Sequence, residues 1–180
     1  PSWAGRRRFR ISSLEPSQLK DRALSLLAAS RLAAPHLHIS LQHASQRILR
    51  RMGRGHYSVD TLLRAVEKIH GFWPVMGLGC DIIVGFPGET EEMFCQTLDL
   101  LKRVQYDMAY TFIYSPRTGT PAAKMDHQIP QEEKSRRLQR LMDVQNVYSL
   151  QLNQAMEHKE YEVIVEGPTK NDENHWFGRT

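Results

Sequence analysis

The sequence predicts an α/β protein in which parallel strands alternate with helices. Residues 82–84 are a short β-branched run that stops at Gly85-Phe86-Pro87-Gly88, as a buried strand opening into a tight loop would. Residues 35–42 alternate strictly between apolar and polar side chains, which is typical of a strand with two different faces. Residues 108–115 are rich in β-branched and aromatic residues, which favour strands.

The first elements expected are a short strand at residues 9–13 and a helix over residues 17–30, because Pro16 suits a first helical turn. The strand at residues 35–42 follows. Its apolar side would carry Leu37, Ile39 and Leu41, and its polar side His36, His38, Ser40 and Gln42. If a barrel wall lies behind the apolar side, the polar side faces a cavity, where its groups need water, partners or a ligand.

Four further elements continue the alternation: helices over 45–52, 58–71 and 91–104, and a strand at 78–84 before the strand at 108–115. Ser58 and Thr90 are natural N-caps, and acids follow Thr90 at the positive end of the helix dipole. Strict alternation indicates parallel strands with right-handed crossovers, either a doubly wound sheet or part of a (β/α) barrel. Ligands bind at the carboxyl ends of such strands, so the loop at residues 85–88 is the first place to expect a site.

The C-terminal part follows a different pattern. Pro130 precedes a predicted helix over residues 131–158, and residues 161–168 then alternate as a solvent-facing strand. The side chains expected on the buried face of that helix are Leu138, Leu141, Met142, Tyr148, Leu152 and Met156. We therefore expect one domain over residues 1–158 and the truncated start of a small β domain over residues 159–180.

Composition excludes several classes of protein. No apolar run approaches the roughly 18 residues of a membrane span and the first residues do not form a signal peptide, so we expect a cytoplasmic protein with no membrane partner. Cys80 and Cys95 are too few for a disulfide framework or a metal cluster, and a metal site at His36, His38 and His43 is not expected either. The net charge of +4 permits a polyanionic partner. The basic stretches at residues 6–10 and 47–54 are not interleaved with aromatic residues in the way that marks base stacking, which favours a solvated face.

Four motifs occur in order along the chain. They are H-L-H-I-S-L-Q at 36–42 with Ser45, Ile48 to Arg54, D-I-I-V-G-F-P-G-E-T at 81–90, and F-I-Y-S-P-R-T-G-T-P-A-A at 112–123. Together they resemble the radical S-adenosylmethionine methylthiotransferases, over nearly the whole chain. Residues 165–169 and 178–180 are similar to the start of the small RNA-binding TRAM β-barrel that closes these enzymes.

The resemblance implies the C-terminal half of a radical SAM (β/α)6 barrel, with strands three to six, followed by the beginning of a small β-barrel. It also implies S-adenosylmethionine bound across the carboxyl ends of the strands, and two four-iron four-sulfur clusters. The family's Cys-x-x-x-Cys-x-x-Cys signature and its three further cluster cysteines are not in this sequence. Without thiolate ligands neither cluster can be held. We therefore expect an N-terminally truncated chain that is inactive alone, and we assign no catalytic or metal-ligating residue.

The resemblance also implies cofactor-binding positions. Gly85, Phe86 and Pro87 would lie against the adenine, which Tyr114 and Ser115 would border. Ser40 and Gln42 would lie near the ribose and methionine moieties, and Ser13 and Glu15 would reach the cofactor's amino group. Arg54 could pair with a carboxylate through its bidentate fork. Each position also has a structural explanation: turn chemistry for the glycine loop, satisfied polar groups in a barrel interior, an exposed arginine, and a core tyrosine.

The substrate expected is transfer RNA, in which the full-length enzyme, a monomer, would insert a methylthio group at C2 of isopentenyladenosine. Residues 112–123 and 167–168 favour that substrate, whereas residues 13–16 and 36–38 favour threonylcarbamoyladenosine, and residues 42–45 a ribosomal-protein aspartate. Two other classes remain open: a non-catalytic fragment or pseudoenzyme that binds S-adenosylmethionine or RNA, and an unrelated (β/α) enzyme. A half-barrel would also expose an apolar interior and aggregate.

Overall fold

The computed structural model describes residues 8–11 and 13–179. Arg6 and Arg7 of the first basic stretch and Thr180 of the predicted tail lie outside these residues. The chain forms two compact units, one up to Leu150 and one from Gln151 onward. The predicted domain boundary, after residue 158, lies eight residues further along the chain and stays a prediction.

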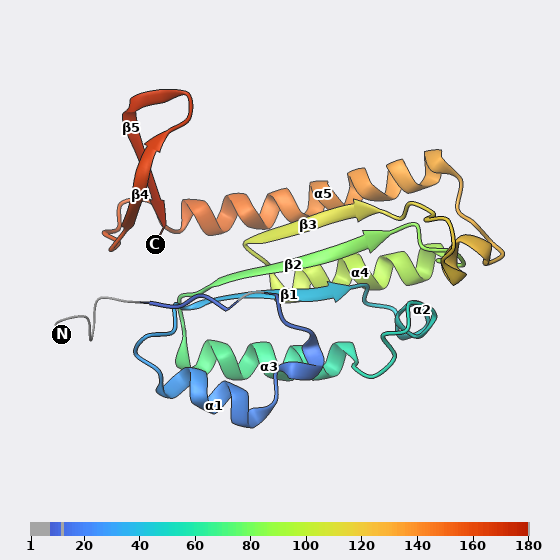
Figure 1. The fold of residues 1–180 in the computed structure, drawn as a ribbon, viewed down its shortest axis with the longest axis horizontal. Helices are drawn as coiled ribbons and strands as arrows, with labels where there is room; N and C mark the ends of the chain where they lie inside the picture. Colours follow the sequence, from blue (N-terminus) through green and yellow to red (C-terminus); the bar gives the residue numbers. More distant parts are fainter. Residues whose placement is uncertain (1–7, 12, 180) are drawn as a thin grey trace. The chain divides into compact units, whose positions relative to one another are not determined.

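A three-stranded parallel sheet forms the centre of the first unit (Figure 1). Its order is β1 (His36–Gln42), β2 (Gly77–Val84) and β3 (Met108–Ile113). The helices are α1 (Asp21–Ala29), α2 (Gln46–Arg51), α3 (Val59–Phe72), α4 (Glu91–Val104) and α5 (Gln131–Gln154), with short 3-10 turns η1 (Pro16–Gln18) and η2 (Pro121–Lys124). The mixed α/β class with a parallel sheet, predicted from the alternation, is confirmed.

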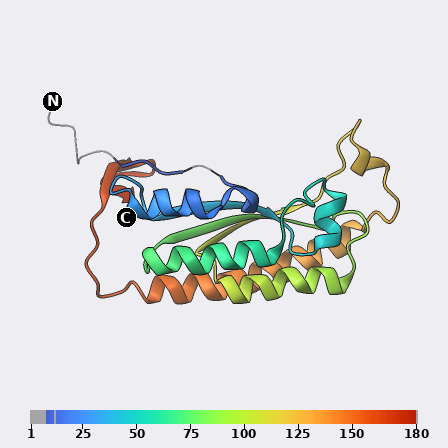
Figure 2. The same ribbon diagram turned by 90° about the horizontal axis from the view of Figure 1, so that it is seen from below.

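One face of the sheet is covered by helices. Figure 2 shows α3, α4 and the first part of α5 on the same side of the strands. The predicted apolar side of β1 faces this layer, because Leu37, Ile39 and Leu41 are fully buried there. On the opposite face of β3, the side chains of Met108, Tyr110 and Phe112 are 53%, 51% and 51% exposed. The sheet therefore has one packed face and one open face, whose β3 side chains are apolar and uncovered among the described residues.

The helix that follows the glycine loop begins and ends where the sequence predicts. Thr90 caps α4 by accepting a hydrogen bond from the Met93 N–H, as Ser58 does for α3 from the Thr61 N–H. The first residue after α4, Gln105, takes a left-handed conformation (φ 54°) that ends the helix.

Two N-terminal predictions are wrong. The described residues 9–11 and 13 form no strand: Phe9 makes an isolated parallel bridge with Ala33 ahead of β1, and Leu14, just after the segment, makes one with Ile39 of β1. The sheet therefore has three strands rather than the four expected. The helix predicted over residues 17–30 is split, because Glu15 and Gln18 cap each other and close η1 as a separate turn before α1 begins.

The buried face of α5 also differs from the prediction. Leu141 is buried as expected, but Met142 and Met156 are exposed. Their places are taken by Lys134, Arg137 and Gln145, which are each 5% exposed. The apolar periodicity did not include these three side chains because they are polar, whereas their donors bond to backbone carbonyl groups and their stems pack on the core.

The second unit contains an antiparallel hairpin of β4 (Ile164–Thr169) and β5 (Asp172–Arg179). The alternating pattern in residues 161–168 thus marks a strand, although it begins later than predicted. The turn is fixed by Asp172, whose pKa is lowered by the backbone N–H of Asn174 and by the His175 side chain. Among the described residues of both units, no helix combines the length and the apolar composition needed to cross a bilayer.

Candidate functional site

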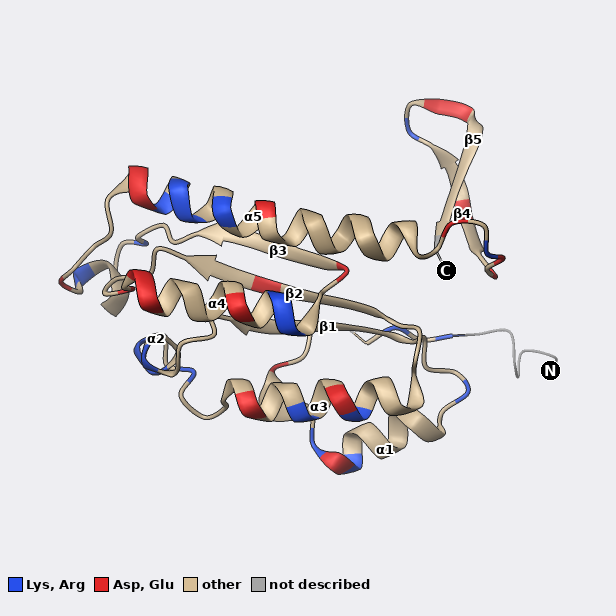
Figure 3. Cartoon of the chain, turned by 180° about the vertical axis from the view of Figure 1, so that it is seen from behind, with Lys and Arg blue, Asp and Glu red and all other residues tan. Residues whose placement is uncertain are grey.

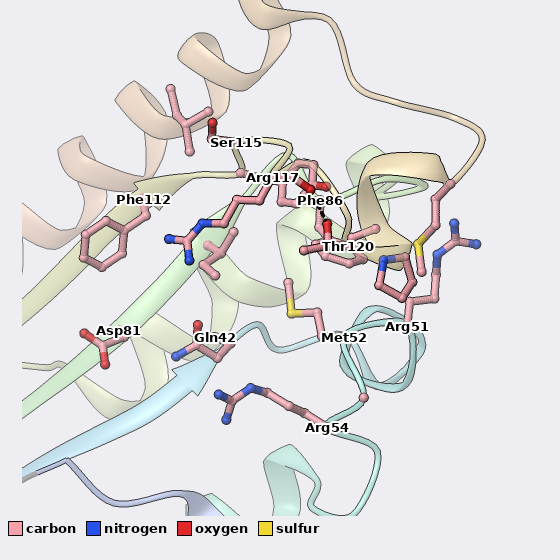
Figure 4. Close-up of a pocket in the computed structure, with 17 residues that line it drawn as sticks. Gln42, Arg51, Met52, Arg54, Asp81, Phe86, Phe112, Ser115, Arg117 and Thr120 are labelled. Carbon is pink, nitrogen blue, oxygen red and sulfur yellow. Dashed lines mark hydrogen bonds between the residues drawn. The ribbon is translucent and has the colours of Figure 1, made fainter.

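An open cavity of about 870 Å³ lies at the carboxyl ends of the strands in the first unit (Figure 4). Its walls come from the end of β1, the turn after α2, the loop after β2 and the segment from β3 to η2. The lining residues that carry polar or aromatic groups are Gln42, Arg51, Arg54, Asp81, Phe86, Phe112, Tyr114, Ser115, Arg117 and Thr120. The cavity thus lies where parallel α/β proteins place their ligands.

The β1 wall is built by an irregular strand end. The pairing of β1 with β2 shifts register between Ile39 and Gln42, and Gln42 takes a left-handed conformation (φ 68°). The Gln42 amide donates a 2.8 Å hydrogen bond to the Ser40 hydroxyl. A non-glycine residue at positive φ is strained, and such strain is concentrated at functional sites. Of the two predicted β1 residues, Gln42 lines the cavity and Ser40 holds its side chain.

The loop after β2 is fixed by a buried carboxylate. Glu89 is 2% exposed overall, and its side chain accepts hydrogen bonds from the Gly85 N–H and from His43 Nε2 at 3.2 Å. His43 Nδ1 accepts from the Ser45 N–H, so the proton of this ring is on Nε2 and points at Glu89. Arg137 of α5 completes the set, 3.3 Å from the carboxylate. These contacts hold the loop in the conformation that presents Phe86 to the cavity.

Gly85 itself is required by both conformation and space. Its φ is +74°, and a Cβ there would overlap Cγ of Lys134. Phe86 lies edge-on to Tyr114, with ring centroids 5.0 Å apart. Gly85 and Pro87 are buried behind Phe86 and do not line the cavity. The loop therefore offers an aromatic surface at the position where the sequence predicts the adenine.

The β3 wall is held by Lys134. Its ammonium group donates to the Tyr114 carbonyl at 3.1 Å and lies 5.3 Å from the centre of the Tyr114 ring. The Tyr114 hydroxyl is buried and has no hydrogen-bond partner among the described residues. A buried hydroxyl without a partner is uncommon, and a ligand in the cavity could supply one. Ser115, next along the chain, is exposed at the cavity edge.

Arg54 lines the cavity but is already paired. Its guanidinium contacts Glu15, and the other Glu15 oxygen lies 2.9 Å from His56 Nε2. The hydrogen bond from His56, followed by the charge of Arg54, lowers the pKa of Glu15. Glu15 thus reaches the cavity only through Arg54. Ser13 is exposed and is not among the lining residues.

Several lining residues were missed by the sequence reading. Asp81 lies on the same face of β2 as Ile83, and its carboxylate is 3.0 Å from His38 Nε2 of β1. In β2 the half-buried residues 81 and 83 alternate with the buried residues 82 and 84, so both point toward the cavity side of the strand. Phe112 alternates in the same way in β3, with Met108 and Tyr110 on its face, whereas Arg51 at the end of α2 and Arg117 in the loop after β3 reach the cavity through the path of the chain.

The cysteines lie away from the cavity lining. Burial, and secondarily the charge of Asp81, raises the pKa of the Cys80 thiol well above its usual range, and Cys95 is half-buried on α4. A thiol with a raised pKa is a poor thiolate ligand. Within the ranges 8–11 and 13–179, no three His, Cys, Asp or Glu side chains gather as a metal site would require.

Comparison with protein families decides the relationship. The model of the radical SAM superfamily matches residues 4–101, more than half of the chain. The chain belongs to the radical SAM superfamily. The matched radical SAM residues include β1, β2 and the glycine loop, which make two walls of the cavity.

Three curated relatives of this radical SAM chain share a name. The chain is 49% identical over 173 residues, 96% of its length, to the tRNA-2-methylthio-N(6)-dimethylallyladenosine synthase of Carboxydothermus hydrogenoformans. Proteins of the same name from Clostridium botulinum (strain Hall) and Syntrophomonas wolfei are 45% and 43% identical over 98% and 99% of the chain. The chain spans 39% to 40% of the length of these three relatives.

A solved radical SAM structure shares the fold. Coproporphyrinogen III oxidase from Escherichia coli superposes with a TM-score of 0.62 at 18% sequence identity, covering 79% of this chain and 32% of that protein. At this identity the likeness concerns the fold alone. It agrees with a mixed α/β fold built on a parallel sheet.

Proposed function

We propose that this chain is part of a transfer RNA methylthiotransferase that inserts a methylthio group at C2 of isopentenyladenosine by radical S-adenosylmethionine chemistry. The observation that carries the proposal is the 49% identity, over 96% of the chain, to a relative named for that product. The substrate of the whole protein is then transfer RNA, and we expect the protein to act as a cytoplasmic monomer.

The cavity suits S-adenosylmethionine. Its volume of about 870 Å³ is within the range of roughly 300 to 1,000 Å³ that small-molecule sites occupy. Phe86 and Tyr114 would flank the adenine, with the unpartnered Tyr114 hydroxyl as a polar contact. Gln42, steadied by Ser40, would bind the ribose and methionine side. Ser115 would border the adenine at the cavity edge.

The remaining predicted positions act at the cavity margin. The Arg54 guanidinium would bind a carboxylate of the ligand while it keeps its contact with Glu15. Ser13 is proposed to approach the same end of the cavity. Gly85 and Pro87 would shape the loop that carries Phe86. S-adenosylmethionine, together with a four-iron four-sulfur cluster, supplies the radical that activates the C–H bond. The cysteine ligands of both clusters would come from outside the sequence given, so this chain alone is expected to be inactive.

The C-terminal hairpin is proposed to begin a TRAM-like RNA-binding β-barrel. Its strands expose Trp176 and Phe177, which are 66% and 47% accessible. Exposed aromatic side chains on a hairpin either stack on nucleic-acid bases or pack against further strands of a barrel. Base stacking and an RNA-binding barrel both suit a protein whose substrate is RNA.

The decisive experiment is mass spectrometry of nucleosides digested from total transfer RNA of the source organism, with and without the intact gene. Loss of 2-methylthio-isopentenyladenosine on deletion supports the proposal, and restoration by the gene in trans is the control. Loss of a methylthiolated threonylcarbamoyladenosine instead would reassign the nucleoside. An unchanged nucleoside profile would contradict the transfer RNA assignment.

If the nucleoside profile is unchanged, two alternative functions remain, and a second measurement distinguishes between them. Residues 42–45 match the pattern noted for relatives that modify a ribosomal-protein aspartate, so intact-mass analysis of ribosomal proteins tests that alternative. If no ribosomal protein changes mass, equilibrium dialysis of the purified full-length protein with S-adenosylmethionine identifies a non-catalytic binder.

A further inference from the structure

Four cations lie in or next to the segments that line the cavity. Arg47 and Arg51 are one helical turn apart on α2 and so share a face of that helix, while Arg117 lies in the loop after β3 and Lys124 in η2. Figure 3 shows Lys and Arg gathered over α2 and over the segment after β3, at the same end of the first unit. We call these four residues the basic rim. Arg51 and Arg117 line the cavity, and Lys124 precedes Met125, which also lines it.

The basic rim differs from the other cationic groups near the cavity because its charges are not neutralised. Arg54 is paired with Glu15, and Arg137 with Glu89 and Glu133. No residue of the basic rim has an ion-pair partner within the described part of the chain. The cavity's own acid, Asp81, pairs with His38. A cluster of uncompensated cations favours a partner with several negative charges.

Arg51 shows that one of these cations is held in place without an acceptor. Its guanidinium packs against Gly88 of the glycine loop, where a Cβ would come within 3.2 Å of Arg51 Cζ. Its Nε is buried and has no hydrogen-bond acceptor among the described residues. Arg117, in the segment after β3, extends toward Phe112 of the same cavity wall (Figure 4). Guanidinium donors placed in this way suit phosphate oxygens, which accept two parallel hydrogen bonds.

Two anionic ligands could meet the basic rim: the carboxylate of S-adenosylmethionine or a chain of phosphates. The positions of the four cations favour the phosphates. The single carboxylate of S-adenosylmethionine can satisfy one guanidinium inside the cavity. Arg47 and Lys124, however, are exposed and are not among the residues that line the cavity. Cations on both sides of a pocket mouth, at a distance from its interior, match a chain of phosphates that crosses the opening.

We propose that the basic rim binds the phosphates on either side of the nucleotide whose base enters the cavity. This inference rests on the proposed function, and it assigns a phosphate-contacting role to α2 and η2 in the first unit. The solvated face predicted for residues 47–54 then becomes part of the RNA-binding surface. Contacts to phosphates position a nucleic acid without reading its bases, so the basic rim would set register and affinity rather than nucleoside choice.

The test uses the full-length protein and a labelled anticodon stem-loop that carries isopentenyladenosine. Arg47→Gln, Lys124→Gln and Arg117→Gln are compared with Arg64→Gln, which removes an exposed charge from α3 on the covered side of the sheet. Each substitution in the basic rim is expected to weaken RNA binding about threefold to tenfold and to reduce the slope of log affinity against log salt by about 0.7. Arg47→Lys should keep most of the affinity, because it keeps the charge.

Affinity for S-adenosylmethionine, measured by equilibrium dialysis, shows whether the basic rim binds RNA phosphates or the carboxylate of the cofactor. Arg47→Gln and Lys124→Gln are expected to leave it unchanged. The inference is overturned if the rim variants bind RNA as Arg64→Gln does, or if Arg117→Gln loses cofactor affinity while RNA affinity stays intact. If the unaltered protein methylthiolates the stem-loop and the rim variants still bind normally, only this inference fails. If the unaltered protein does not bind the stem-loop, the proposed function fails with it.

Discussion

Gly85→Ala tests how the glycine loop is held. The substitution places a Cβ at φ +74°, which costs roughly 1 to 2 kcal/mol for a residue other than glycine. The new methyl group also overlaps Lys134, which must move away from the Tyr114 carbonyl and leave a buried acceptor unsatisfied, at about 1 to 3 kcal/mol. The two contributions add to about 2 to 5 kcal/mol. We expect a local destabilisation of this size in the loop, β2 and the start of α4.

Two other glycines separate the contributions. Gly119→Ala introduces the positive-φ strain alone, since a Cβ there meets nothing within 4 Å. Gly71→Ala introduces neither, because Gly71 lies in the last turn of α3 with open space around it, and alanine should stabilise the helix by roughly 0.5 to 1 kcal/mol. The expected order of stability is therefore Gly71→Ala, unaltered protein, Gly119→Ala, Gly85→Ala.

Native-state hydrogen exchange of the full-length protein, resolved by peptide mass spectrometry, measures these local free energies. Lys134→Ala supplies a second check, because removing the overlapping stem should cost less stability in the Gly85→Ala background than in the unaltered protein. The reasoning is refuted if Gly85→Ala loses no more protection than Gly119→Ala, or if the two substitutions at the contact are additive.

Three further changes probe other contacts. Arg137→Leu should destabilise the first unit by about 3 to 5 kcal/mol, because it leaves the buried Glu89 carboxylate without its cation, and Glu89→Gln in the same chain should restore part of the loss in urea unfolding. Bonding to Arg136, then Arg137, lowers the pKa of Glu133 from 4.5 to about 2. The stabilisation from Glu133 is therefore present above pH 4.5 and lost toward pH 2, so the stability difference between the protein and Glu133→Gln should shrink across that range and stay constant above it. The 180-residue chain expressed alone should aggregate through the uncovered face of β3, as measured by light scattering. The double substitution Met108→Lys and Tyr110→Lys should slow this aggregation. A clear monomeric solution of the unaltered chain would contradict the view that this face needs a covering element.

How far the fold was predictable depends on where its stabilisation comes from. The alternation in residues 36–42 and the caps at Ser58 and Thr90 are local signals, and they place β1, α3 and α4 to within one or two residues. The strand predicted at residues 9–13 failed because a strand exists only where neighbours pair with it, and Phe9 and Leu14 make single bridges. Pairing along an edge is a tertiary property that composition does not carry.

The site was predictable to a similar extent, and for a comparable reason. Residues inside regular motifs, such as Gln42, Phe86 and Tyr114, line the cavity as expected. Arg51 and Arg117 belong to segments whose direction is fixed by a turn, so their approach to the cavity follows from the three-dimensional path of the chain. Arg54 was correctly placed at the cavity, but its pairing with Glu15 joins residues 39 positions apart and was not foreseen.

The polar residues on the buried face of α5 explain why the loops around the cavity can be rigid. Lys134 donates to the Tyr114 carbonyl and Arg137 to the Glu89 carbonyl, beside the cavity, whereas Gln145 donates to the Tyr106 carbonyl at the other end of β3. Strand ends and loops carry carbonyl groups that no ladder satisfies, and apolar side chains cannot bond to them. Isosteric Lys134→Met would keep the packing and remove only the donor. Its effect should therefore appear in the affinity for S-adenosylmethionine before it appears in global stability, and the opposite order would show that α5 supports the fold rather than the cavity.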